Sequence, residues 1–334
     1  MPDLRSGPER LILAPNERLY GNTERLLARL SELRTAASLT HHHPAVTFLS
    51  LSEVLRQWEA AGLDAGVFRY GLALLRLRYS ALGLARLLPL ERVLVGVEST
   101  QPDAFGGFHH PNQGYRHLQM QALITMYGPM ATGLPENPPV AALDLLRSYA
   151  HDCLHYGSCR TYRLLGESVV RGQYGLNFRR PDGRSYSAPD PVGSRTTRNL
   201  GIVMEGACDR EARTITRLAA EQCQIHEPSP GIDRYAYRDV TGLLDVDDID
   251  PASASSPVTT AFLTAMASYQ RNINDRYAAF LDEVGHTESY ELHTVILSAI
   301  ISGDVTTVCA WLDQHNGPYT FATLFLSPSY LTAG

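Results

Sequence analysis

Two histidines one helical turn apart are the first residues of this chain whose types and spacing could do chemistry. They are His151 and His155, in the stretch SYAHDCLHYGSCRTYR, and Asp152 directly follows the first. On an α-helix, positions i and i+4 share a face, with about 5–6 Å between their Cβ atoms. The two imidazoles can therefore bind one metal ion. The alternative for the pair alone is that ordinary hydrogen bonds satisfy both rings.

A second pair with the same spacing supports the metal interpretation. Glu205 and Asp209 lie in the stretch LGIVMEGACDREART. A catalytic zinc site usually takes three protein ligands and leaves one position open for water. We expect His151, His155 and Glu205 to be these ligands, with Asp209 holding one histidine through its other ring nitrogen.

Taken together, the two stretches resemble the gluzincin class of zinc metallopeptidases. In that class a His-x-x-x-His helix precedes a helix with a glutamate ligand, often in the form Glu-Gly-x-x-Asp. The matching segments are HDCLH at 151–155 and EGACD at 205–209, and the resemblance covers well under a fifth of the chain. It implies a zincin-like metallohydrolase fold with an active-site helix and a separate glutamate-ligand helix, bound Zn²⁺, and a peptide or small amide substrate. It also implies that Asp152 is the general base and that His293 is a candidate to stabilise the oxyanion.

Two features depart from the pattern of this class. Asp152 stands where the class has a glutamate, so the side chain of the expected base is one methylene shorter. The separation of His155 and Glu205 is 205 − 155 = 50 residues, which is long. A predicted β-hairpin at 172–190 would fill part of this interval. The interval also contains further candidates for the oxyanion donor, which are Tyr162, Tyr174 and Tyr186.

The adjacent His151 and Asp152 also fit a different class, the HD-domain phosphohydrolases. There the metal ligands would be His117, His151, Asp152 and Asp209. This interpretation leaves Glu205 without a role, whereas the gluzincin interpretation leaves His117 without one. A third interpretation, a non-catalytic binding protein on a zincin-like fold, would apply if no metal binds.

The composition excludes several other classes of protein. All 29 basic residues are arginine, which rules out a lysine Schiff base and a Walker A loop. The net charge of −6 gives no basic footprint for nucleic acid. The longest apolar stretch, at 81–97, is interrupted by charges and a proline, so we expect no membrane span. Five cysteines without CxxC spacing and a charged N-terminus indicate free thiols and a cytoplasmic location.

The elements that must position these residues are mainly helical. Apolar periodicity predicts helices at 16–38, 51–62, 67–88, 115–127, 141–156, 198–223, 258–284, 288–302 and 304–314, and β-branched runs predict strands at 45–51 and 91–99. The expected fold class is therefore α+β and helix-rich. We expect an N-terminal helix and strand region at 1–100 and a metallohydrolase-like region at 101–334, whose C-terminal helices start at about 258. The oligomeric state does not follow from these patterns.

Overall fold

A computed structural model describes residues 14–36, 46–99, 107–109, 118–120, 137–180, 185–187, 189–250 and 257–326. Within these ranges the chain is helix-rich and contains two small sheets, which confirms the expected α+β class. None of the helices in these ranges is both long and apolar enough to cross a membrane.

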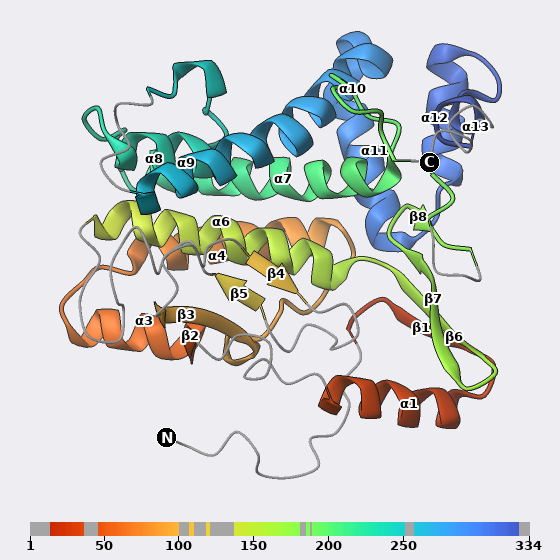
Figure 1. Cartoon of the computed structure of the whole chain (residues 1–334), viewed down its shortest axis with the longest axis horizontal. Helices are drawn as coiled ribbons and strands as arrows, with labels where there is room; N and C mark the ends of the chain where they lie inside the picture. The colour runs from red at the N-terminus through yellow and green to blue at the C-terminus, as the bar shows by residue number, and fades with distance from the viewer. Residues whose placement is uncertain are drawn as a thin grey trace.

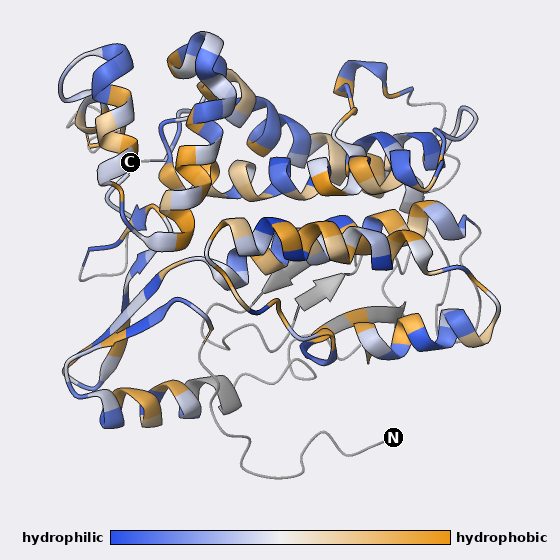
Figure 2. Ribbon diagram, turned by 180° about the vertical axis from the view of Figure 1, so that it is seen from behind, coloured by the Kyte–Doolittle hydropathy of each residue, from blue (hydrophilic) through white to orange (hydrophobic). Residues whose placement is uncertain are grey.

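Two long helices occupy the middle of the molecule (Figure 1). They are α6 (Pro138–Gly157) and α7 (Leu200–Gln222), which pack along each other, and α4 (Gly66–Ala81) contacts both. Hydrophobic residues recur along α6 and α7 in Figure 2, as expected for helices that share a core. These two helices carry both of the sequence pairs singled out above.

One sheet lies on the side of α6 opposite α7 (Figure 1). Its strands are β2 (Val46–Ser50), β3 (Val93–Ser99), β5 (Leu118–Met120) and β4 (Gly107–His109), in that order. β3 and β5 are parallel, and the other neighbours are antiparallel. Helix α3 (Leu51–Ala60) follows β2 directly. The Ser50 hydroxyl accepts a hydrogen bond from the Glu53 amide and so caps the start of this helix. A 3₁₀ turn at Leu90–Arg92 leads into β3.

The second sheet extends from the C-terminal end of α6. Its order is β1 (Glu17–Tyr20), β6 (Arg160–Leu165), β7 (Ser168–Tyr174) and β8 (Asn177–Phe178), with β1 parallel to β6 and the other pairs antiparallel. Helix α1 (Thr23–Ala36) packs on it through Leu26 and Leu30, which bury Tyr162. Since β6 begins directly after α6, this sheet lies next to the second histidine.

The C-terminal half is a set of helices around α7. They are α8 (Ile232–Thr241), α9 (Pro257–Tyr269), α10 (Arg276–Gly285), α11 (Ser289–Ser302), α12 (Thr306–Asn316) and α13 (Thr320–Phe325). Short 3₁₀ turns lie at Val246–Asp248 and His286–Glu288. A π-helical turn, Gln270–Asp275, joins α9 to α10 and packs against α7. Such turns often occur at functional sites.

Several predicted elements differ from the structure. The predicted helix at 16–38 begins as strand β1, and α1 starts only after Asn22, whose side chain accepts a hydrogen bond from the Arg25 amide at 3.0 Å. Residues 118–120 form a strand inside the predicted helix at 115–127, and the rest of that segment lies outside the described residues. The predicted hairpin at 172–190 corresponds in part to β7 and β8, followed by a bridge between Arg179 and Ser185. Strand β6 and helix α8 were not predicted.

The largest hydrophobic cluster joins elements from most of the described chain. It includes Trp58 of α3, Phe68 of α4, Leu146 of α6 and Phe280 of α10. The cluster therefore contains residues from both sides of residue 100. The division into regions at 1–100 and 101–334 stays a prediction.

Candidate metal centre

The positions of the two histidines follow from the way α6 begins and ends. Asn137 caps the helix by accepting a hydrogen bond from the Val140 amide, and two prolines occupy the first turn, where no amide donor is needed. His151 and His155 lie in the last two turns, on the same face. Their ring centroids are 4.5 Å apart in an edge-on arrangement. The spacing therefore produces the shared face that the sequence indicated.

Glu205 reaches both rings from α7. Its Oε1 lies 3.2 Å from His151 Nε2, and its Oε2 lies 3.1 Å from His155 Nε2. One ligand atom from each of the three residues lies within 4.8 Å of the others. The structure thus brings together the three residues expected to bind a metal, from two helices that are distant in sequence.

The second nitrogen of each ring has its own partner. His151 Nδ1 lies 3.4 Å from Asp209 Oδ1, and His155 Nδ1 lies 2.9 Å from the Tyr174 hydroxyl. A ring that carries its proton on Nδ1 donates to these oxygens and keeps the Nε2 lone pair for a metal. The Asp209 carboxylate can only accept, so it favours this tautomer of His151, whereas the Tyr174 hydroxyl can donate or accept and fits either tautomer of His155. The sequence suggests Tyr174 as a candidate oxyanion donor, whereas the structure places its hydroxyl against His155.

Asp209 is fully buried and is held by two arginines. Arg147 forms an ion pair with its Oδ1, and Arg213 Nε lies 2.9 Å from its Oδ2. Arg213 also donates to Asp239 at 2.5 Å and to Gln270 at 2.6 Å. Burial alone would raise the pKa of Asp209, but the two guanidinium groups and His151 hold it below its usual value. Asp209 is therefore a fixed anion behind His151.

The three clustered side chains have unequal charges. Burial alone would lower the pKa of His151, but Glu205 and Asp209 raise it to about 10. Burial lowers the pKa of His155 and outweighs the effect of Glu205. Burial opposes ionisation of Glu205, yet the two histidines hold its pKa well below 4.5. The raised pKa of His151 favours its protonated form beside the Glu205 carboxylate, so binding of a divalent cation at its ring would release that proton.

Asp152 is the half-buried carboxylate next to this cluster. Its pKa is raised from 3.8 to about 7, mainly by burial; His151 opposes the rise, and Glu205 contributes to it. A carboxyl group that titrates near neutral pH is well matched to general-base catalysis. Its position directly after His151 agrees with the role that the resemblance implies.

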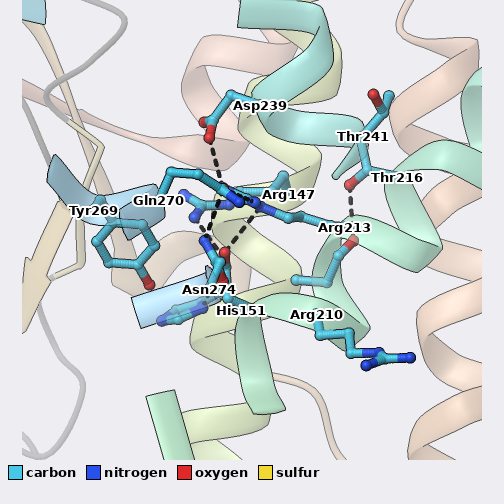
Figure 3. Close-up of polar contacts among 12 residues, drawn as sticks. Arg147, His151, Arg210, Arg213, Thr216, Asp239, Thr241, Tyr269, Gln270 and Asn274 are labelled. Atoms are coloured by element: carbon cyan, nitrogen blue, oxygen red, sulfur yellow. Dashed lines mark hydrogen bonds and ion pairs between the residues drawn. The ribbon is translucent and has the colours of Figure 1, made fainter. Parts of the chain in front are cut away.

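Tyr269 is a residue at the cluster that the sequence interpretation missed. Its hydroxyl donates a hydrogen bond to Glu205 Oε1 at 3.0 Å, and the Arg147 guanidinium lies 5.4 Å from its ring centroid. Figure 3 shows Tyr269 beside Arg147 and His151. It is the last residue of α9, and no spacing pattern connects it with Glu205, which is 64 residues earlier. The packing on α7 of the π-helical turn that follows α9 brings it here.

His293 lies elsewhere. Its Nδ1 is 2.9 Å from the Tyr277 hydroxyl, and its Nε2 is 3.4 Å from Glu211 Oε2. Glu211 follows Glu205 by six residues, which places it on a different side of α7. The structure therefore does not bring His293 to the cluster. It gives no support to the expectation that His293 stabilises an oxyanion.

The HD-domain interpretation can be compared with the structure only in part. His117 lies outside the described residues. His151 and Asp152 are adjacent, but both carboxylate oxygens of Asp209 form ion pairs, one with Arg147 and one with Arg213. Glu205, which that interpretation leaves unused, lies between both histidines. The described residues thus bring together His151, His155 and Glu205, and the HD-domain ligand set stays a prediction.

Access to the cluster is from the side of Glu205. The side chain of Glu205 is 32% exposed, that of His151 13% and that of His155 1%. A ligand from solvent would therefore meet the carboxylate first. Compared with protein-family models, curated proteins and solved structures, the chain gives no significant match to any of them.

Proposed function

We propose that the protein is a metal-dependent hydrolase in which His151, His155 and Glu205 bind one zinc ion. The observation that carries this proposal is the convergence of their ligand atoms to within 4.8 Å of one another. Two imidazoles and one carboxylate form a ligand set known from catalytic zinc sites with an open fourth position. A zincin-like fold and a peptide or small amide substrate are proposed on the resemblance of the two helices.

The residues around the cluster have separable tasks in this proposal. Zinc would supply a polarised water molecule and a Lewis acid for the carbonyl group. Asp152 takes a proton from the attacking water, for which its raised pKa suits it. Asp209 favours the required tautomer of His151, and the Tyr174 hydroxyl orients the ring of His155. Tyr269, which lies beside Glu205, is better placed than His293 to donate a hydrogen bond to a developing negative charge.

A second candidate function is metal binding without hydrolysis. Two observations favour it, namely the shorter aspartate in place of the usual glutamate and the Tyr269 hydroxyl that already occupies Glu205 Oε1. In that case the metal would join α6 to α7 and serve stability or partner binding. The two candidate functions have the same metal ligands and differ only in whether the protein hydrolyses a substrate.

Elemental analysis of the purified protein tests the shared part. We expect about one zinc ion per chain, and Glu205→Ala should lose most of it because a three-ligand site becomes a two-ligand site. Glu221→Ala, which removes an exposed carboxylate near the end of the same helix, is the matched control and should keep the metal.

His117→Ala separates the two metal interpretations. It should leave the zinc content unchanged if the ligands are those proposed here. Loss of metal in His117→Ala with retention in Glu205→Ala would replace this ligand set with the HD-domain one. A wild-type protein that takes up no zinc, even after incubation with it, would contradict the proposal altogether.

A further inference from the structure

A single wide turn separates a helix of the main core from a helix that lies outside it. Helix α10 contributes Phe280 and Leu281 to the largest hydrophobic cluster. None of the described residues of α9 belongs to that cluster, and Leu263 and Met266 lie instead in a small separate cluster with part of α8. The two helices follow one another past α7, joined by the π turn at Gln270–Asp275 (Figure 1). The main core therefore holds α10 directly, whereas α9 is held by the turn and by its small cluster.

The turn places two consecutive side chains at the metal centre. The Tyr269 hydroxyl donates a hydrogen bond to Glu205 Oε1 at 3.0 Å. The side-chain oxygen of Gln270 accepts a hydrogen bond from Arg213 Nη1 at 2.6 Å (Figure 3). Arg213 in turn forms an ion pair with the buried Asp209. Tyr269 and Gln270 thus contact one proposed metal ligand and the arginine that supports the carboxylate behind another.

The side chain of Gln270 makes a hydrogen bond that is specific to a π turn. Its amide nitrogen donates to Asp275 Oδ1 at 2.7 Å, which joins residues i and i+5. In an α-helix these positions lie about 140° apart around the axis, whereas the wider π turn brings them to the same side. The oxygen of Gln270 also accepts from Asn274 at 3.3 Å. Gln270 is only 8% exposed, so the π register satisfies a buried amide group.

The register of the turn decides where the Tyr269 side chain points. A π turn contains one residue more than the α-helical turn that it replaces, and each residue of an α-helix adds about 100° of rotation. If the turn became α-helical while α10 kept its place in the core, α9 would rotate by about 100° relative to α7. Tyr269 would then leave Glu205. The contact between them therefore depends on the extra residue in the turn.

We propose that the π turn is a positioning device for the metal centre and that Gln270 is the positioning residue that maintains it. In the π register, Tyr269 holds the Glu205 carboxylate where it meets both histidines. In an α-helical register the carboxylate loses this support and binds metal more weakly. Because coupling is reciprocal, metal bound to Glu205 also stabilises the π register. The effect on metal rests on the proposed function, whereas the register itself does not.

Deletion of Asn272 tests the register, because it removes one exposed residue from the turn. Asn272→Ala is the matched control, since it changes the same residue and keeps the length of the turn. Each change is combined with Tyr269→Phe, and circular dichroism measures the melting temperature of the metal-free protein. Tyr269→Phe should lower the melting temperature by about 1–3 °C in the wild type and in Asn272→Ala, because it removes a hydrogen bond to a carboxylate. In the deletion variant it should have no effect, because that hydrogen bond is already lost.

Zinc affinity tests the effect on the metal centre and is measured by competition with a chromophoric chelator. Tyr269→Phe should weaken zinc binding by about tenfold, as is typical for loss of a hydrogen bond to a metal ligand. Asp275→Ala removes the i+5 acceptor of Gln270 at an exposed position and should weaken zinc binding severalfold. Asp282→Ala, the same change at an exposed position of α10, should leave zinc binding unaltered.

The outcomes separate this proposal from the proposed function. If the wild type binds no zinc, the proposed function fails, and the melting temperatures still decide the register. An equal effect of Tyr269→Phe in the deletion variant and in Asn272→Ala would overturn the proposal, because Tyr269 would then contact Glu205 in either register. Wild-type zinc affinity in both Tyr269→Phe and Asp275→Ala would overturn it as well. If the deletion variant does not fold, Asp275→Ala replaces it, and a full effect of Tyr269→Phe in that background would contradict the proposal.

Discussion

His151 and His155 lie one turn apart on α6, yet their surroundings differ. His151 faces a carboxylate that two arginines neutralise, whereas His155 faces a phenol whose ring lies between two guanidinium groups, those of Arg160 and Arg171. The i, i+4 spacing of each of the two pairs could be predicted from the sequence, because it depends on positions within a single helix. Tyr174 and Tyr269 come from other elements, so no local spacing assigns them to the cluster.

The role of Asp152 can be tested by a substitution that keeps its shape. A residue that directly follows His151 lies about 100° further around the helix, so it reaches the water rather than the metal. Asp152→Asn should therefore keep zinc near the wild-type content and reduce hydrolysis by about 10²–10⁴-fold, as is typical for loss of a general base. Metal content and turnover of a peptide or amide substrate are measured on the same preparation.

Asp144→Asn is the matched control for this experiment, because it makes the same change two turns earlier on α6. It should retain both metal and turnover. Loss of zinc from Asp152→Asn would show that the aspartate is a ligand, and unchanged turnover would show that it is not the base. Asp152→Glu, which restores the usual residue of the class, should also retain zinc.

The elements around the cluster meet at unusually short distances. Gly206, next to the ligand Glu205, allows α10 to approach α7, since a Cβ atom there would lie 2.5 Å from the Cβ of Tyr277. The π-helical turn between α9 and α10 then directs two consecutive residues to the cluster, Tyr269 to Glu205 and Gln270 to Arg213. The sequence predicts the helices at 141–156 and 198–223 well, because both show clear apolar periodicity. It predicts one helix at 258–284, since the periodicity does not reveal the extra residue of a π turn.

Gly206→Ala tests the close approach of α7 and α10. An added methyl group would overlap Tyr277, which is buried and cannot move without shifting α10. We expect a loss of stability of about 1–3 kcal/mol, as for other overpacked cores, together with weaker zinc binding because Tyr269 moves with α10. Thermal unfolding and zinc titration measure the two effects.

Leu218→Ala, at an exposed position of the same helix, is the control and should change stability by less than about 0.5 kcal/mol. Within a helix, alanine is more favourable than glycine by about 1 kcal/mol, which would raise the stability of Gly206→Ala if the added methyl group met no neighbour. A Gly206→Ala protein that melts at a higher temperature than the wild type would therefore show that helix propensity dominates and that the contact with Tyr277 is not tight.

The whole molecule is held together by contacts that no local pattern reveals. Strand β1 pairs in parallel with β6, so that Glu17 lies opposite Arg160, far apart in the sequence. The segment RTYRLL mixes apolar, polar and basic residues without regular alternation, which is why strand β6 was not predicted, and only the end of β7 falls within the predicted hairpin at 172–190. Their pairing depends on β1 and on the burial of Tyr162 by α1. The helix-rich class could be predicted, whereas the second sheet could be predicted only in part, through the hairpin at 172–190.

The stability of the whole fold should depend on pH through Asp144. Burial raises the pKa of this carboxyl group from 3.8 to about 7, and nearby Asp239 raises it while Arg147 opposes the rise. The folded state thus binds the proton more tightly than the unfolded state does. The contribution of this group is most favourable below its unfolded pKa and is lost as the pH rises from about 4 to about 7.

Asp144→Asn removes this dependence. The melting temperature of the variant relative to the wild type should rise between about pH 4.5 and about pH 8, by a few degrees. Circular dichroism at the two pH values measures it, with the exposed Asp282→Asn as the control. A difference that is the same at both pH values, or that falls as the pH rises, would contradict the assignment.

The proposed ligands come from α6 and α7 alone, so the distances between them depend on the register of these two helices along each other. A slide of α7 by one residue along α6 moves Glu205 by about 1.5 Å. Its carboxylate now lies 3.2 Å from one ring and 3.1 Å from the other, and such a slide would separate it from at least one of them. In the 50-residue interval between His155 and Glu205, Tyr174 of β7 also contacts His155, whereas the segment between β8 and α7 contains none of the residues described at the cluster. Insertions in that segment would preserve the cluster, whereas a single residue added between His151 and His155 would separate its two rings.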